Sequence, residues 1–513
     1  MTHRRRNNGV VLILVLVVVA LLSLSAFTFS DLMLTEREAA VVSGQTVQAR
    51  ALADSGVDAL RAFLMFDSET RRDAGGLFDN ELEFRGRIVK EDPDDAFRGR
   101  FCVIAPLSDE EGYVGAGLRY GLENESARIN LNALLLAELQ GENASRDQLV
   151  ALPGMTEEIA DAILDWIDED EEPREFGAEI EYYSGLPIPY APKNGTLDSV
   201  EELLLVRGMT SSLLYGLDHN RNGIIDPQEA GEAIETETTD NTDGMLDRGW
   251  AAYFTLYSEE LNLTSLGEPR IFLNMEDMQQ LYDELSVVFD EQWATFVVVY
   301  RQNGPYRGND EGVMGATGEF DLSQPGRFPL SQVLDLVDQK VRVQFDGEEK
   351  PTVIGTTFPD GPIAMSTYLP QLMDQCTVYP EPTIPGRINI NEAPRAVLQA
   401  IPGMEVDLVD AIISARVEDP DDETDHRKDE TWLLTTALVS LDEMKALMPY
   451  VTTGGDVYRA QVIGYFDRGG PATRLEVVLD ATRDLPSILM WRNISHLGRG
   501  HPLETLGIDV VVD

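Results

Sequence analysis

A loop between Asp218 and Glu229 carries oxygen-bearing side chains at the spacing that a calcium ion requires. Its first, third, fifth, ninth and twelfth positions are all Asp, Asn or Glu, and Gly223 at the sixth position permits the sharp turn of such loops. The final Glu229 can bind an ion through both of its oxygens. The pattern predicts calcium as the ion, held by Asp218, Asn220, Asn222, the main-chain carbonyl of Ile224, Asp226 and Glu229.

Only three of these ligands are acidic, because the third and fifth positions are Asn. A lower ligand charge predicts weaker binding, in the range of about 10⁻⁴–10⁻³ M that extracellular modules show. Pro227 and Gly231 disfavour a helix after the loop, so we expect a structural ion rather than a sensor. The alternative is an Asn/Asp-Gly turn that binds no metal. A second possible metal loop, without Asp at its first position and without the final Glu, follows at Asn241, Asp243 and Asp247.

Strand-like segments that could support this loop lie far away from it on both sides. Apolar and polar residues alternate between residues 85 and 122, and again in Tyr458–Phe466, Arg474–Asp480 and Ile488–Arg492. The sequence between the two sets is poor in this alternation and mostly helical in pattern. We therefore expect an α+β fold, in which residues 76–125 and 450–513 form one antiparallel sheet. A mainly helical region at 126–449, which contains the calcium loop, is inserted between them.

The inserted region contains a repeated pattern of a helix, a Pro-Gly turn and a second helix. It occurs at Leu152-Pro-Gly-Met155 and Ile401-Pro-Gly-Met404, with a degenerate copy at Val206-Arg-Gly-Met209. The pattern resembles helix-hairpin-helix modules, which in DNA-binding proteins hold a phosphate through turn amides and basic neighbours. Here acidic residues follow the turns, and the chain has 90 acidic against 40 basic residues, a formal net charge of -50. This charge disfavours nucleic acid as a partner, and we interpret the hairpins as packing modules.

A shorter motif, Arg-Ile-x-Leu/Ile-Asn, occurs three times, at residues 128–132, 270–274 and 387–391. It predicts an extended segment whose final Asn caps a following helix, which assigns this role to Asn132, Asn274 and Asn391. The wide spacing of the copies indicates three related submodules rather than a solenoid.

The amino terminus combines a basic flank with a long apolar run. Three consecutive arginines precede Gly9, and the residues from Val10 to Phe29 are almost all apolar. Twenty helical residues span roughly 30 Å, the thickness of a bilayer core. A cleaved secretory signal, a plain signal anchor, or a leader that ends at Gly9 would each supply such a run. The apolar stripe that continues from Thr35 to Phe66 favours the last explanation, because it predicts a helix that leaves the membrane and packs on a head.

This arrangement resembles type IV prepilins and the pseudopilins of type II secretion, which are cleaved before the apolar helix, here between Gly9 and Val10. Most of these proteins have Glu as the fifth mature residue, where its carboxylate can pair with the amino terminus of a neighbouring subunit. That position is Leu14 in this chain. A subunit without this acid is expected at the tip of a filament, where no further subunit stacks above it. With Leu164-Asp-Trp-Ile-Asp168 and Arg387-Ile-Asn-Ile-Asn-Glu-Ala-Pro394, the chain resembles the general secretion pathway protein K (GspK) family.

The resemblance implies a pilin-like fold, in which a long N-terminal helix packs on an antiparallel sheet and carries an inserted α-helical domain. It also implies a minor pseudopilin that caps the pseudopilus tip with GspI-like and GspJ-like minor pseudopilins and supports protein export across the outer membrane. The prepilin peptidase would process and N-methylate the chain.

On this basis residues 1–9 are a leader, 10–30 the transmembrane part of the helix and 31–75 its periplasmic part. The protein would then be a single-pass protein of the inner membrane with its bulk in the periplasm.

An alternative function is a membrane-anchored helix-hairpin-helix protein for DNA binding or uptake. An enzyme is not expected, because the sequence has no phosphate-binding loop, nucleophile elbow or zinc-protease signature. The two cysteines, Cys102 and Cys376, leave open whether they pair.

Overall fold

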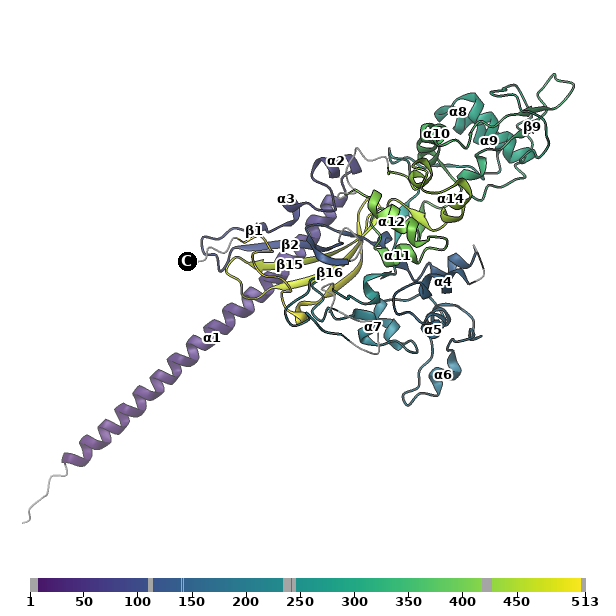
Figure 1. Cartoon of the computed structure of the whole chain (residues 1–513). Helices are drawn as coiled ribbons and strands as arrows, with labels where there is room; N and C mark the ends of the chain where they lie inside the picture. The colour runs from purple at the N-terminus through teal and green to yellow at the C-terminus, as the bar shows by residue number, and fades with distance from the viewer. Residues whose placement is uncertain are drawn as a thin grey trace, which may run out of the picture.

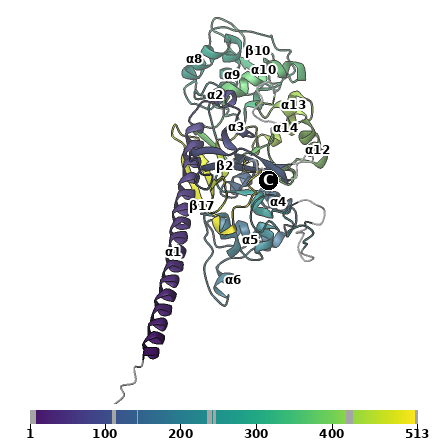
Figure 2. The same ribbon diagram turned by 90° about the vertical axis from the view of Figure 1, so that its left-hand side faces the viewer.

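A long helix, a curved antiparallel sheet and a large inserted region make up the molecule (Figure 1). The structure is a computed structural model, and it describes residues 8–108, 114–139, 141, 143–233, 241, 246–417 and 427–508. Helix α1 (Asn8–Leu64) projects far beyond the rest, as a second view confirms (Figure 2). This arrangement confirms the predicted pilin-like α+β fold.

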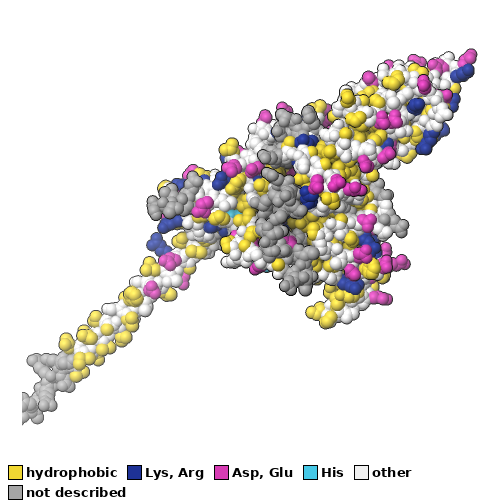
Figure 3. Space-filling model, in the orientation of Figure 1, with side chains coloured by type: hydrophobic (Ala, Val, Ile, Leu, Met, Phe, Trp, Pro, Cys, Tyr) yellow, Lys and Arg dark blue, Asp and Glu magenta, His cyan; other side chains and the backbone are white. Residues whose placement is uncertain are grey.

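Helix α1 has two halves with different surroundings. Its large apolar side chains from Val10 to Leu34 are exposed along the projecting half, which is largely yellow in Figure 3. By length and apolar composition this helix could cross a membrane. The second half is buried where Leu52, Val57 and Leu60 face strands of the sheet. The helix ends at Leu64, because the chain turns there and Asp67 caps a separate short helix, α2 (Ser68–Asp73).

The sheet joins the two ends of the chain. Its strand order is β1-β2-β15-β16-β17, with β3 paired to β2, β4 paired to β15, and all pairs antiparallel. The central pairing sets Cys102 of β2 opposite Ile463 of β15, and both side chains are buried on the face of the sheet away from α1, because the neighbouring Val462 contacts Gly56 of α1. The strands are β1 (Arg87–Lys90), β2 (Gly99–Ser108), β3 (Val114–Arg119), β4 (Glu123–Asn124), β15 (Val457–Phe466), β16 (Thr473–Asp480) and β17 (Ser487–Asn493).

The inserted region consists of three submodules, each closed by a short parallel ladder. In each, the strand of the Arg-Ile motif pairs in parallel with a strand at the far end of the same submodule. The pairs are β5 (Ile129–Asn130) with β6 (Phe254–Thr255), β8 (Ile271–Phe272) with β11 (Cys376–Thr377), and β13 (Ile388–Asn389) with β14 (Val451–Thr452). The three copies of the motif therefore do begin related units.

The final Asn of each motif does not cap a following helix, so that expectation was wrong. The side chain instead bonds the main chain of a distant loop, which satisfies its amide without any helix end. In two copies it both donates to and accepts from one residue. The pairs are Asn132 with Leu197 (3.1 and 2.7 Å), Asn274 with Leu330 (2.9 and 2.8 Å), and Asn391, which donates only, with Arg427 (2.9 Å).

Each Pro-Gly or Arg-Gly turn joins two short helices. The turn glycines Gly154, Gly208 and Gly403 have φ values of 72°, 82° and 83°, a left-handed conformation that glycine adopts without strain. The flanking helices are α4 (Ala144–Val150) and α5 (Glu157–Ile167), η3 (Val200–Leu205) and α7 (Ser211–Tyr215), and α11 (Arg395–Gln399) and α12 (Val406–Ala415). The longer helices of the second submodule are α8 (Met278–Val288), α9 (Glu291–Asn303) and α10 (Pro362–Gln375).

The two cysteines belong to different cores. Cys102 lies in the core built around the sheet, and Cys376 lies in the core of the inserted region. Both are buried and free. Burial raises the pKa of the Cys102 thiol to about 12, so neither thiol ionises readily in its core.

Candidate calcium loop and its contact with the sheet

The loop from Asp218 to Glu229 folds tightly and is largely buried. The two carboxylate oxygens of Asp218 accept the main-chain N–H groups of Asn222 and Gly223, each at 3.0 Å. Gly223 has a φ of 76°, which confirms the sharp turn expected at that position. Asp218, Asn222 and Glu229 are only 3–4% exposed. The predicted spacing therefore corresponds to a compact local fold.

The later ligand positions close back onto the earlier ones. Glu229 accepts the N–H of His219 (3.0 Å) and that of Asp226 (3.2 Å). The Asp226 carboxylate accepts the side-chain amides of Asn220 (2.5 Å) and Asn222 (3.1 Å). The side-chain oxygen of Asn222, at the fifth position, also accepts the N–H of Ile224 at 2.9 Å. All six predicted ligand residues are thus joined in one hydrogen-bonded ring.

The electrostatics of the ring favour a cation. Burial raises the pKa of the Glu229 carboxyl above its ordinary value, and the charges of Asp218 and Asp226 act in the same direction. Within the described residues, no three His, Cys, Asp or Glu side chains are grouped as a metal site built from them alone would require. The loop would therefore hold calcium with amide and main-chain oxygens as well, which is the mixed oxygen set that this ion takes. The donor chemistry fits calcium.

The second possible metal loop braces the first one. Asn241 is buried, donates to the main-chain oxygen of Glu229 (3.1 Å) and accepts the N–H of Asp247 (2.7 Å). The main-chain oxygen of Asp247 accepts the N–H of Leu217, next to Asp218, at 2.8 Å. These contacts connect the two ends of the first loop. Asp243 lies outside the described residues.

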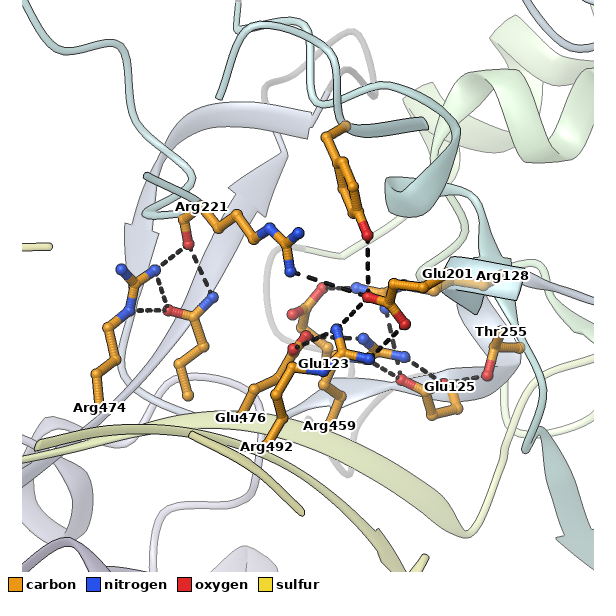
Figure 4. Close-up of polar contacts among 12 residues, drawn as sticks. Glu123, Glu125, Arg128, Glu201, Arg221, Thr255, Arg459, Arg474, Glu476 and Arg492 are labelled. Carbon is orange, nitrogen blue, oxygen red and sulfur yellow. Dashed lines mark hydrogen bonds and ion pairs between the residues drawn. The ribbon is translucent and has the colours of Figure 1, made fainter. Parts of the chain in front are cut away.

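The calcium loop rests directly on the sheet. Arg474 of β16 donates to the main-chain oxygens of Asn220 (2.8 Å) and Arg221, as Figure 4 shows for Arg221. Gln461 of β15 donates to the same oxygen of Arg221 at 3.0 Å and accepts from Arg474 at 3.0 Å. Burial lowers the pKa of Arg474 to about 10, and Asp218 opposes this shift. The Arg474 side chain is fully buried, so its guanidinium donors are directed to the main-chain carbonyls of this loop and not to water.

A network of buried and half-buried charges continues this contact across the sheet (Figure 4). Arg459 of β15 pairs with Glu125 (2.6 Å) and Glu476 (2.8 Å), and Arg492 of β17 pairs with Glu201 (2.5 Å). Burial opposes ionisation of Glu125, but the guanidinium groups of Arg459 and Arg128 outweigh it and lower the pKa of this carboxyl. A lowered pKa is the reverse of what a general acid needs. The network suits the attachment of the inserted region to the sheet.

Sequence reasoning did not find this contact. Its residues carry no local spacing signal, because they come from the segment that ends at Arg128, from η3 and from three C-terminal strands. The one available hint was charge on the sheet strands, where Arg459, Glu476 and Arg492 stand among apolar residues. Those charges are now explained by partners on the inserted region.

The fold, with its membrane-length N-terminal helix, its antiparallel sheet and its large insertion, defines a pilin-like protein with a potential single-pass membrane anchor. Residues 127–219 match the family model described as Type II secretion system (T2SS), protein K. The chain is 34% identical over 102 residues to type II secretion system protein K of Pectobacterium carotovorum subsp. carotovorum, which covers 19% of this chain and 28% of that protein. These matches confirm the resemblance of the chain to the type II secretion system protein K family.

Other similarities are more distant. Protein K of the type II secretion system of Klebsiella pneumoniae is 25% identical over 218 residues, 42% of this chain and 62% of that protein. The chain thus spans less than two thirds of the length of these curated relatives. A solved structure of the GspK-GspI-GspJ complex from enterotoxigenic Escherichia coli aligns over 90% of this chain and 98% of the other, with 12% identity and a TM-score of 0.36.

Proposed function

We propose that the chain is a minor pseudopilin of the type II secretion system. It would cap the tip of the pseudopilus together with GspI-like and GspJ-like minor pseudopilins and so support protein export across the outer membrane. The observation that carries this proposal is the match of residues 127–219 to the protein K model, combined with the exposed apolar half of α1. Such a half-helix needs a bilayer before assembly and the helices of other subunits afterwards.

Position Leu14 supports a place at the tip. The side chain is 62% exposed on the projecting half of α1 and carries no charge to neutralise the amino terminus of a neighbour. The bulky inserted region supports the same place, because it widens the molecule at the end opposite the projecting helix (Figure 1). A subunit stacked above would meet this head rather than a second α1.

Calcium would act as a structural ion in this proposal. The loop at Asp218–Glu229 lies between the inserted region and strands β15 and β16. An ion bound there would hold the head in a fixed relation to the sheet. The proposed ligands remain Asp218, Asn220, Asn222, Ile224, Asp226 and Glu229.

The decisive experiment is mass spectrometry of the mature amino terminus of the full chain, expressed in the inner membrane of a host that has a prepilin peptidase. We expect a chain that begins at Val10 and carries one methyl group on its amino terminus. A Gly9→Leu variant should stay uncleaved, because a bulky residue replaces the small one before the cut. An intact Met1 in the wild type, or a cut near residue 30, would refute the pseudopilin proposal.

The partner proposal has its own test. The mature chain, purified in detergent with tagged GspI-like and GspJ-like proteins from the same secretion system, should elute as one ternary complex. Separate elution of the chain under these conditions, with the other two proteins still together, would exclude it from the tip complex.

A further inference from the structure

A cavity of about 670 Å³ lies where the second and third submodules meet. The second submodule contributes Cys376 of β11 to its lining, and the third contributes Tyr450, which follows α14 (Leu441–Leu447). Two lining residues also join the submodules, because Gln332 donates to the main-chain oxygen of Lys445 at 3.0 Å. The volume falls within the range of about 300–1,000 Å³ that ligand-binding sites take.

The walls of this cavity are largely apolar. Ile384 and Met448 are each 6% exposed, and the rings of Tyr379 and Tyr450 are partly buried beside them. The turn of the third hairpin forms another part of the wall, where a Cβ on Gly403 would meet no atom within 4 Å. A ligand would therefore find an apolar surface already in place, with free space along one side.

The charge on the walls is opposite in sign to the charge of the chain. Of the described residues that line the cavity, three are cationic, Arg270, Arg387 and Lys445, and one, Glu430, is anionic. The whole chain, in contrast, has a formal net charge of -50. Arg387 is already paired, with Glu260 at 2.5 Å and with Glu430 at 2.9 Å. Two cations, Arg270 and Lys445, remain for a ligand.

Both remaining cations are available for a negative charge. Arg270 donates its Nε–H to the main-chain oxygen of Asp374 (3.2 Å), and within the described residues neither Arg270 nor Lys445 has an ion pair. Asp429 lies near Arg270, but burial raises the pKa of this carboxyl to about 6, and its oxygen accepts the N–H of Thr431 at 3.0 Å. Asp429 is thus a weak competitor for the guanidinium.

We propose that this cavity binds the C-terminal end of a peptide chain whose last residues are apolar. Arg270 would hold the terminal carboxylate through its two terminal nitrogens, a planar pair that matches the two carboxylate oxygens. Lys445 would add a point charge. The apolar side chains of the peptide would pack on Ile384, Met448 and Tyr450, where burial removes their surface from water.

A fatty acid carries the same carboxylate but fits this lining less well. The polar side chains of Ser331, Gln332 and Thr377 stand among the apolar ones. A hydrocarbon chain would cover these groups without a hydrogen bond, whereas the amide groups of a peptide can bond with them. The proposal goes beyond the pseudopilin role, since its test needs neither the prepilin peptidase nor the other pseudopilins.

Fluorescence anisotropy with the full chain in phospholipid nanodiscs tests this proposal. The probe is the peptide Ser-Gly-Ser-Ala-Leu-Leu with fluorescein at its amino end, used as the free acid and as the C-terminal amide. We expect the free acid to bind with a Kd below about 1 mM. The amide should bind at least about tenfold more weakly, because it lacks the charge that the two cations would pair with.

Single substitutions assign the binding to the two cations. Lys445→Gln and Arg270→Gln should each weaken binding of the free acid by about tenfold and leave that of the amide unchanged. Lys445→Gln protects the test against a folding defect, because Lys445 is partly exposed and its side chain makes no hydrogen bond or ion pair with the described residues. The matched control Arg468→Gln removes an exposed charge on the turn between β15 and β16, and should bind like the wild type.

Three results would overturn the proposal. The first is no binding of the free acid at about 1 mM chain. The second is equal binding of the acid and the amide, or of the acid by the wild type and Lys445→Gln. The third comes from competition, where the unlabelled free-acid peptide should displace the probe better than sodium octanoate does. Stronger displacement by octanoate would assign the cavity to a fatty acid.

Discussion

Asp218 and Glu229 are the two buried carboxylates at the ends of the calcium loop. Replacing both of them tests whether this loop binds a stabilising calcium ion. The variant Asp218→Ala/Glu229→Ala should have a lower melting temperature than the wild type in calcium, but not in chelator. At a free calcium tenfold above the dissociation constant, the lost stabilisation would be about 1.4 kcal/mol. Thermal unfolding of both chains in the two buffers measures the difference.

The control for this experiment is Glu232→Ala, which removes one carboxylate just outside the loop, where the side chain is partly exposed. Its calcium response should match that of the wild type. If the double variant also keeps the full response of the wild type, the loop binds no stabilising ion.

His501 offers a pH test at the same scale. Its ring is 3% exposed, and neither ring nitrogen has a hydrogen-bond partner. Burial, and then the positive charges of Arg474 and Arg499, lower the pKa of His501 to about 3. The folded state therefore favours the neutral ring. Its stabilisation is complete above pH 6.5, the ordinary value, and is lost as pH falls from there toward 3.

Over that window His501 should make the free energy of unfolding fall by about 1.4 kcal/mol for each pH unit. In the variant His501→Phe, which keeps a flat ring but cannot take up a proton, the fall from pH 6.5 to pH 5 should be smaller by about 2 kcal/mol. Urea unfolding at several pH values in chelator measures both slopes. Parallel slopes for the two chains would show that His501 does not titrate in this way.

At the scale of elements, the close approach of α1 to β15 depends on Gly464. A Cβ at this position would stand 2.3 Å from the main-chain oxygen of Ala49 and 2.4 Å from the nitrogen of Ala53. Backbone atoms of a helix cannot move aside singly, so Gly464→Val should force α1 away from the sheet. We expect a loss of at least about 3 kcal/mol in the free energy of unfolding, the upper end for an overpacked core.

The matched control is Gly454→Val, because nothing lies within 4 Å of a Cβ there. Urea unfolding of both variants gives the comparison, and tryptic cleavage at Arg50 reports on the helix itself. Equal stability of Gly464→Val and Gly454→Val would mean that α1 is not seated on β15 as described.

Sequence patterns predicted individual elements better than their contacts. The pattern at 458–466 and 474–480 predicted β15 and β16 closely, because the side chains of a strand alternate between its two faces and this alternation depends only on the strand's own residues. The role of Asn132 was missed, since the partner of its side chain, Leu197, is chosen only when the submodule closes. The short parallel ladders escaped prediction for a related reason, because two residues give no measurable alternation.

The whole molecule decides the state of the two cysteines. Cys102 and Cys376 occupy separate cores, so no disulfide joins them without unfolding of one core. Alkylation of the native chain should label neither thiol, and alkylation in denaturant without reductant should label both. Labelling of fewer than two thiols in denaturant would contradict the separation of the cores.

Local spacing in the sequence was sufficient for the membrane-length helix, the sheet strands and the sharp turn at Gly223 in the loop from Asp218 to Glu229. These features depend on residues that are close together in the sequence, so the sequence alone contains the pattern that produces them. The tertiary structure alone decided that Arg474 and Gln461 hold the calcium loop on the sheet, and that Arg459 pairs with Glu125. A charged side chain pairs with the opposite charge that the fold brings within a few ångströms of it. That distance between two residues cannot be read from their separation in the sequence.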